Sequence, residues 1–339
     1  HILHTSDVKC NAFLGGILRN YDSNLILDDC SPWSVIEADE YDRSFHQLNP
    51  YIAVVTSTDP DHLDIYGDEK GYLEGFAHFT SLIATGGTLI LHTGLKLKPR
   101  TVEGVNTLTY SGGNEGDWHT ANIRYDDGRL WFDIVHPDGI IRDVELGVPI
   151  AINIDNAVAA AAATHLAGAS DDNIRQALRT FLGAKRRFET WLRPEDSACG
   201  TVLIDDYAHS PHEVEASITS VRKLYPGREL TVVFQPHLYT RTRDFAPEFA
   251  QALSHADRVV LLEIYPAREK PIPGVTSQII YDRLTSPHRL ICPRQNLLNL
   301  IKNSNFEILM TLGAANLDVL LPDIKEILTA KTVGTHDPV

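Results

Sequence analysis

Acidic clusters follow two apolar runs of the sequence that are typical of buried parallel strands. Glu37 lies in the string EADEYD after the run 33–36, and His62 lies in the string DPDHLD after the run 51–55. Carboxylate oxygens are the ligands that Mg²⁺ prefers, and phosphate oxygens complete its coordination. Either loop alone is explained by solvation. Two such loops at successive strand ends predict a site that holds one divalent cation.

An asparagine pair lies at the start of a predicted Ala-rich helix over 156–167. Asn153 and Asn156 belong to the string NIDN. Asparagine at a helix start is usually an N-cap, and a cap suffices to explain at least one of the two. A side-chain amide can also read an adenine edge, because it offers both donors and an acceptor. From the residues alone, capping is the favoured interpretation.

A third group follows the first strand predicted in the second half of the chain, 201–204. The string DDYAHSPHE places Asp206, Tyr207 and His209 in the turn after that strand. The first such turn of a doubly wound sheet faces the ligand crevice. Asp206 could accept hydrogen bonds from ribose hydroxyls, Tyr207 could stack on a base, and His209 could orient a carboxylate or phosphate. A helix start with its loop is the structural alternative, and both can hold together.

Basic residues form two further candidate anion sites. Arg187 lies in KRRFE, where the pair of arginines is either a salt-bridged surface or a phosphate clamp. His237 and Arg241 lie in FQPHLYTRTRD, directly after the predicted strand 230–234. We interpret these two residues as anion-binding candidates.

The elements that must position these residues differ between the two halves of the chain. Two Asp-Gly turns, at 127–128 and 138–139, predict antiparallel hairpins in the first half. From residue 200 onward, strand-like runs alternate with helical stretches, which predicts a doubly wound parallel sheet covered on both faces. We therefore expect an α/β protein with two domains, 1–187 and 188–339.

Composition excludes several classes of protein. The chain of 339 residues has 30 Lys and Arg against 45 Asp and Glu, a formal net charge of −15, which disfavours nucleic acid as a partner. No apolar run reaches the length needed to span a bilayer, so we expect no membrane partner. Four scattered cysteines are typical of reduced thiols. These features predict a cytoplasmic protein.

Taken in order, the strings resemble the Mur ligase family over about Cys10 to Leu328. The strings are EADEYD, DPDHLD, NIDN, KRRFE, DDYAHSPHE, FQPHLYTRTRD, YPAREKPIPG and LGAAN. The resemblance implies a central ATPase-type domain with an antiparallel hairpin patch, then a Rossmann-like C-terminal domain that binds the amino acid. The family's phosphate-binding loop, GxxGK(S/T), does not occur in these residues, and we expect it upstream of His1.

The resemblance also implies a reaction. ATP and Mg²⁺ are the expected cofactors, and UDP-N-acetylmuramate and L-alanine the substrates, joined through an acyl phosphate with release of ADP and phosphate. We further expect a monomer or weak homodimer. The implied roles are metal binding by Glu37 and His62; ATP binding by Asn153, Asn156, Arg187, Asp206 and Tyr207; substrate binding by His209, His237 and Arg241; and catalysis by Arg187 and His209.

Two other functions remain open from the residues. A metal-dependent phosphohydrolase could use the clusters at 59–64 and 205–212, and it would release phosphate without any amino acid. A non-catalytic nucleotide-binding module would lack the phosphate loop altogether.

Overall fold

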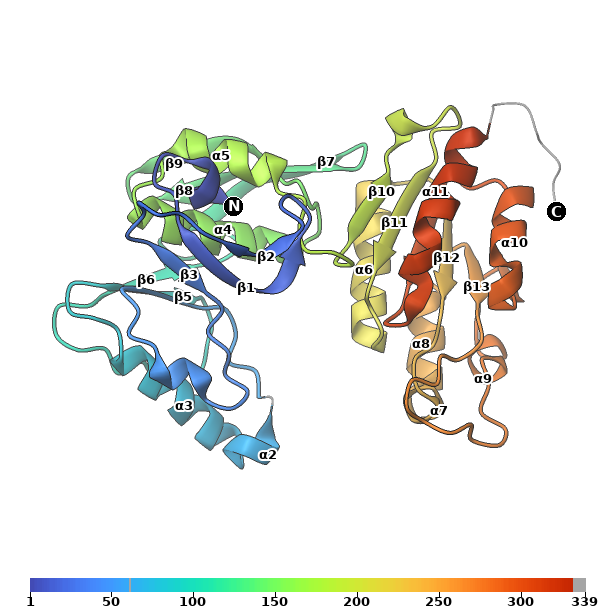
Figure 1. Ribbon diagram of the computed structural model, residues 1–339, viewed down its shortest axis with the longest axis horizontal. Coiled ribbons are helices and arrows are strands. Elements are labelled where there is room, and N and C mark those ends of the chain that lie inside the picture. The colour runs from blue at the N-terminus through green and yellow to red at the C-terminus, as the bar shows by residue number, and fades with distance from the viewer. Residues whose placement is uncertain (61, 332–339) are drawn as a thin grey trace. The chain divides into compact units, whose positions relative to one another are not determined.

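The chain separates into two compact units, His1–Leu182 and a second that begins at Gly183. Residues 1–60 and 62–331 are described in the computed structural model (Figure 1). The division precedes the domain boundary that we expected between 187 and 188. Arg186 belongs to the second unit because its backbone N–H donates to Glu189 and its carbonyl accepts from the Tyr207 N–H.

The first sheet of the first unit has the strand order β2-β1-β3. Its strands are β1 (Asn11–Leu18), β2 (Ser23–Ile26) and β3 (Ser34–Ile36). β1 pairs antiparallel with β2 and parallel with β3. All three residues of β3 are exposed, so the expectation of a buried strand at 33–36 is wrong. The reason is that β3 is an edge strand of a small sheet, paired with β1 on one side.

The second sheet is parallel and has the order β4-β5-β6. Its strands are β4 (Ile52–Val55), β5 (Thr88–His92) and β6 (Asn106–Tyr110). Helix α3 (Glu69–Ser81) begins at Asp68, whose side chain accepts from the Gly71 N–H. Its aromatic face forms one hydrophobic core with β4 and β5, in which Phe79 and Leu89 are buried. Burial of such side chains supplies about 1.5–3 kcal/mol each.

The third sheet is the antiparallel patch that the two Asp-Gly turns predict. It consists of β7 (His119–Asp126), β8 (Arg129–His136) and β9 (Gly139–Glu145), paired in that order. The remaining helices of this unit are α1 (Ile2–Thr5), η1 (Ser44–Gln47), α2 (Leu63–Tyr66), α4 (Ile152–Leu166) and α5 (Asp171–Thr180). Ser170 and Asn173 form a capping box that starts α5.

The second unit contains a six-stranded sheet of order β10-β11-β15-β12-β13-β14. Its strands are β10 (Glu189–Leu192), β11 (Val202–Asp206), β12 (Leu230–Phe234), β13 (Arg258–Leu261), β14 (His288–Ile291) and β15 (Ile308–Leu312). All neighbours are parallel except β10 and β11, which are antiparallel. The sequence did not predict β10.

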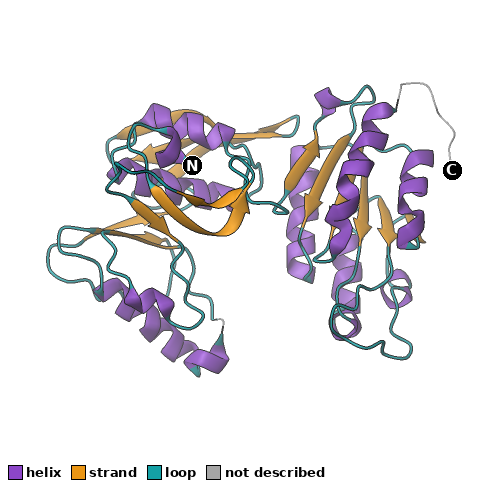
Figure 2. Cartoon of the chain, viewed as in Figure 1, coloured by secondary structure: helices purple, strands orange, loops and turns teal. Residues whose placement is uncertain are grey.

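Helices cover both faces of this sheet, as Figure 2 shows. The described helices of this unit are η2 (Pro194–Asp196), α6 (Pro211–Leu224), α7 (Tyr239–Asp244), α8 (Ala246–Leu253), α9 (Gln278–Tyr281), η3 (Arg294–Asn296), α10 (Leu297–Asn303), η4 (Asn316–Leu320) and α11 (Leu321–Ala330). On one face, Leu297 of α10 and Leu328 of α11 share a core with Val233. On the other face, the ring of Phe249 in α8 lies 5.2 Å from that of Phe234. The doubly wound fold is therefore confirmed.

None of the helices in residues 1–60 and 62–331 combines the length and apolar character that crossing a bilayer requires.

Glycine is required where β15 ends beside β12. Gly313 has a φ of 139°, and a Cβ placed there would lie 2.7 Å from the carbonyl oxygen of Gln235. Side chains rarely tolerate that φ, and a contact so short forces the backbone to move. A side chain at position 313 would therefore push the carboxyl ends of β12 and β15 apart.

We predict that Gly313→Ala lowers the free energy of unfolding by about 3 kcal/mol, because backbone strain and overpacking add. The matched control is Gly227→Ala, where φ is 81° and no atom lies within 4 Å of the added Cβ. Backbone strain alone should lower the free energy of unfolding of Gly227→Ala by about 1 kcal/mol. Urea unfolding followed by circular dichroism measures both values, and equal losses would contradict the role of the close approach.

Candidate functional site

The carboxyl ends of β11, β12 and β15 lie side by side in the second unit. Asp206 and Phe234, the last residues of β11 and β12, both align with Leu312, the last residue of β15. In open α/β sheets, ligands bind outside such ends, where the strand order reverses. Most candidate residues of this unit are found here.

A buried carboxylate anchors this edge of the sheet. Asp205 is fully buried, accepts a 2.5 Å hydrogen bond from the hydroxyl of Thr311, and lies 3.6 Å from Nε of Arg186. Burial raises the pKa of Asp205 to about 6, although Thr311 and the positive charge of Arg186 oppose the shift. Part of the Asp205 population is therefore protonated near pH 6.

Arg186 joins this carboxylate to the neighbouring strand end. Its Nη2 donates to the carbonyl of Gly313 at 2.7 Å, and its Nη1 lies 3.6 Å from Asp318. Its guanidinium also lies 5.0 Å from the ring centroid of Tyr207, whereas that of Arg187 lies 5.9 Å from the same ring. Sequence reasoning selected Arg187 and missed Arg186, because nothing in two adjacent arginines indicates which one faces the sheet.

The side chains of Asp206 and Tyr207 have different environments. Asp206 is buried, receives a hydrogen bond from the hydroxyl of Ser217, and has a pKa raised mainly by burial. Tyr207 is half-buried, with both arginine guanidinium groups over its ring. The predicted ATP contacts of Asp206 and Tyr207 stay predictions, and the Ser217 bond gives Asp206 a structural role as well.

His209 is held at the start of α6. Its Nδ1 lies 3.0 Å from the carbonyl of Tyr207 and 3.3 Å from Glu213, and its ring centroid lies 6.4 Å from that of His237. Ser210 caps the helix in a capping box with Glu213. Glu213 therefore takes part both in the predicted helix cap and in the orientation of His209.

His237 and Arg241 carry buried polar atoms that the described residues leave without a partner. These atoms are Nδ1 of His237 and Nη1 of Arg241. The His237 ring stacks on Tyr265 with centroids 5.9 Å apart. Burial, followed by the charges of Arg241 and His209, lowers the pKa of His237, so its ring is neutral at pH 7. A neutral imidazole beside a guanidinium suits a bound carboxylate, and unpaired buried polar atoms are costly unless a ligand completes them.

The turn that bears this pair is fastened to the loop after β13. The N–H of Leu238 donates to the Tyr265 carbonyl at 3.0 Å, and that of Thr240 donates to Glu269 at 3.0 Å. Leu238 has a φ of 71°, a strained backbone conformation for a branched residue. Backbone strain of this kind persists only where the surrounding structure enforces it, and it is often found at functional sites.

In the first unit, His62 lies beside the EADEYD loop, where it is close to Glu40 and Tyr41. Although β3 and β4 belong to different sheets, Nε2 of His62 lies 3.8 Å from Oε1 of Glu40, and its ring packs edge-on against Tyr41. The Glu37 carboxylate lies over Gly15 of β1, where an added Cβ would overlap it. Carboxylate oxygens with one imidazole fit a hard divalent cation. Metal binding by Glu37 and His62 stays a prediction, and Asp61 lies outside the described residues.

The two asparagines of the NIDN string do not cap α4. Ala151 occupies the N-cap without a side-chain hydrogen bond, so the capping interpretation is wrong. Asn153 instead donates to the carbonyl of Val148 at 3.1 Å, and Asn156 donates to the side-chain oxygen of Asn153 at 3.2 Å. Asn156 is exposed. Adenine recognition by the pair stays a prediction.

The aspartate between them positions the helix, and sequence reasoning missed it. Asp155 accepts a 2.6 Å hydrogen bond from the Gly112 N–H and lies 3.0 Å from Nε2 of His92. His92 ends β5, and Gly112 follows β6. Asp155 thus fixes the start of α4 at the carboxyl ends of two parallel strands.

Comparisons with known proteins identify the family. Residues 33–164 match the model of the Mur ligase middle domain, and residues 186–305 match that of the Mur ligase, glutamate ligase domain. The chain is 52% identical over 328 residues to a UDP-N-acetylmuramate–L-alanine ligase of Parabacteroides distasonis, covering 97% of this chain and 70% of the relative. The chain belongs to the Mur ligase family.

Other relatives of this Mur ligase agree with that finding. The protein of the same name from Porphyromonas gingivalis strain W83 is 48% identical, with 97% of this chain and 72% of the relative covered. The crystal structure of UDP-N-acetylmuramate-alanine ligase from Thermotoga maritima superposes with a TM-score of 0.74 at 23% identity, covering 96% of this chain and 69% of that one. MurF ligase from Thermotoga maritima in complex with ADP superposes at 0.64 and 16% identity, with 97% and 75% covered. The two structures establish the shared fold.

The raised pKa of Asp205 predicts a specific pH dependence of stability. The usual pKa is 3.8 and the folded value is about 6, so between these values the folded protein binds a proton that the unfolded chain releases. The contribution of Asp205 to the free energy of unfolding should therefore fall by about 2 kcal/mol as pH rises from 4 to 6. Asp205→Asn should remove this decrease, since amides do not titrate.

Urea unfolding at several pH values between 4 and 7 measures the difference between parent and variant. The control is Asp318→Asn, which removes a partially exposed partner of Arg186 and should keep the decrease. Parallel profiles for the parent and Asp205→Asn would show that Asp205 is not the titrating group.

Proposed function

We propose that the full-length protein is an ATP-dependent ligase that joins L-alanine to the lactyl carboxylate of UDP-N-acetylmuramate, in peptidoglycan precursor synthesis. One observation carries this proposal: relatives with that printed activity are 48–52% identical over 97–98% of the chain. The strand-end site with His237 and Arg241 supports it, because the substrates are carboxylates.

Charge neutralisation is the main physical demand of this reaction. A carboxylate and a triphosphate repel each other, so their approach needs fixed positive groups. We assign Arg187 to the phosphates, and Asn153, Asn156, Asp206 and Tyr207 to the nucleotide. Glu37 and His62 would hold Mg²⁺, which when bound offsets negative charge on phosphate oxygens.

Two successive substitutions complete the proposed chemistry. A lactyl carboxylate oxygen attacks the γ-phosphorus. The bond between this phosphorus and the β,γ-bridging oxygen breaks, and ADP leaves with that oxygen. The amine of L-alanine then attacks the carbonyl carbon of the acyl phosphate, loses a proton and expels phosphate. His209, His237 and Arg241 would bind and orient the carboxylates. A neutral His237 can approach the cationic Arg241 without repulsion, which suits this role.

We further propose that the enzyme acts in the cytoplasm as a monomer or weak homodimer, without nucleic-acid or membrane partners. All four cysteines are free, as reducing conditions require. The net charge of −15 opposes contact with nucleic acid.

An assay of ADP formation tests the proposed activity. The protein with its upstream sequence should form ADP when ATP, Mg²⁺, UDP-N-acetylmuramate and L-alanine are all present, and omission of the sugar nucleotide or the amino acid should abolish turnover. A panel with glycine and L-serine measures selectivity. Phosphate release that is independent of amino acid would favour a phosphohydrolase, and absence of turnover would favour a nucleotide-binding module.

Two arginines of α7 provide a matched pair of variants. Arg241 has an unpaired buried Nη1, whereas Arg243 is exposed and ion-paired with Asp244 at 2.7 Å. We predict that Arg241→Ala lowers kcat/KM for L-alanine by about 10- to 150-fold, the equivalent of a charged hydrogen bond of about 1.5–3 kcal/mol. Arg243→Ala should change it less than about threefold. Equal effects in steady-state assays would remove Arg241 from substrate binding.

A further inference from the structure

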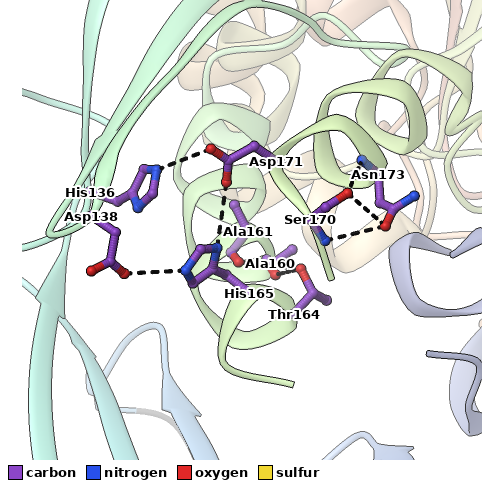
Figure 3. Close-up of polar contacts among 9 residues, drawn as sticks. All are labelled: His136, Asp138, Ala160, Ala161, Thr164, His165, Ser170, Asp171 and Asn173. Atoms are coloured by element: carbon purple, nitrogen blue, oxygen red, sulfur yellow. Dashed lines mark hydrogen bonds and ion pairs between the residues drawn. The ribbon is translucent and has the colours of Figure 1, made fainter. Parts of the chain in front are cut away.

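A second polar cluster lies in the first unit, apart from every residue assigned above. His136 ends β8 and Asp138 lies in the turn before β9, while His165 is in the last turn of α4 and Asp171 in the first turn of α5. Figure 3 shows the four side chains directed toward one another. The cluster thus joins the antiparallel hairpin to two helices.

The spacing of these groups is close to that of metal ligands. Nε2 of His165 lies 3.3 Å from Oδ2 of Asp138, and one ligand atom from each of His136, Asp138 and His165 lies within 4.8 Å of the others. Around a tetrahedral Zn²⁺ with bonds of about 2.0–2.1 Å, neighbouring ligand atoms are about 3.4 Å apart. Small side-chain movements would bring the three ligands to that distance.

The environment of His136 is not explained by ion pairs among the four side chains. Its side chain is 2% exposed, and neither ring nitrogen has a hydrogen-bond partner among the described residues. Oδ2 of Asp171 lies 3.6 Å from Nε2, too far for a hydrogen bond. Buried polar nitrogens without hydrogen-bond partners lower the stability of the folded protein. A bound ligand would complete the interactions of this ring.

Aromatic packing and a carboxylate hold the rings in place. The buried Trp118 stacks on His136, with centroids 4.7 Å apart, and lies edge-on to His165 at 5.3 Å. The Asp171 carboxylate lies 3.5 Å from Nδ1 of His165, the nitrogen opposite the one that faces Asp138. A carboxylate behind a ligating histidine typically fixes its tautomer and raises its basicity.

We propose that His136, Asp138 and His165 bind one divalent transition-metal ion, with Zn²⁺ the best fit, and that Asp171 is a positioning residue. Two imidazoles and one carboxylate suit Zn²⁺, whereas Mg²⁺ prefers a ligand set made mostly of oxygen atoms. The two carboxylates balance the charge of the ion. Its binding would fasten the β8–β9 hairpin to α4 and α5, and a water molecule can occupy the fourth position.

The two Asp-Gly hairpin turns provide a matched test. Asp138→Asn removes a proposed ligand, and Asp127→Asn makes the same change in the other turn. Both side chains lie in exposed turns, so both variants should fold. The parent protein, stripped of metal with a chelator, should bind one equivalent of Zn²⁺ in calorimetric titration, and Co²⁺ should produce visible absorption bands of a tetrahedral site.

We expect Asp138→Asn to weaken Zn²⁺ binding at least tenfold and Asp127→Asn to leave it unchanged. Saturating Zn²⁺ should also raise the Tm of the parent but not that of His165→Asn, and excess Mg²⁺ should not compete. Absence of Zn²⁺ binding in the parent would overturn the proposal, as would equal binding by Asp138→Asn. Zn²⁺ held elsewhere, for example by Glu37 and His62, would survive both the Asp138 and the His165 substitutions and so count against this site.

Discussion

In each unit, one carboxylate at the carboxyl ends of parallel strands ties a neighbouring segment to the sheet. Asp155 receives the Gly112 N–H and faces His92, and Asp205 receives Thr311 and faces Arg186. Strand ends leave polar groups that the sheet no longer pairs, and low local dielectric strengthens the bonds that complete them. These two contacts set the positions of α4 and of the segment at 186–188, so the candidate nucleotide residues on both segments depend on them.

Local patterns were sufficient to predict most elements, but not how every strand joins a sheet. The Asp-Gly turns and the alternation after residue 200 predicted the hairpins and the doubly wound sheet because turn chemistry and periodicity act over a few residues. The exposure of β3 and the antiparallel edge strand β10 were missed. Both depend on pairing between distant segments, and β10 lies in a charged stretch that resembles a linker.

Residue types at strand ends also predicted where polar groups gather, as with His209 and His237, whose rings lie 6.4 Å apart. The sequence could not show which polar groups already have partners. Arg186 rather than Arg187 contacts Asp205, and the NIDN asparagines bond elsewhere than in a cap. Asp138 was recognised only as a turn residue, since His165 is distant in sequence. Each hydrogen bond depends on the direction of a side chain, which is fixed only when distant segments pack together.

Unpaired buried atoms have a consequence for the balance between stability and activity. Nδ1 of His237 and Nη1 of Arg241 lower the stability of the second unit while no ligand completes them. A carboxylate that supplies the missing acceptor for Arg241 recovers that free energy, so its binding stabilises the folded unit by linkage. Replacing these side chains with apolar ones of similar volume would remove the destabilisation and the recognition together. Such residues are expected in a binding site and not in a core selected only for stability, and this supports the proposal that these two side chains bind substrate.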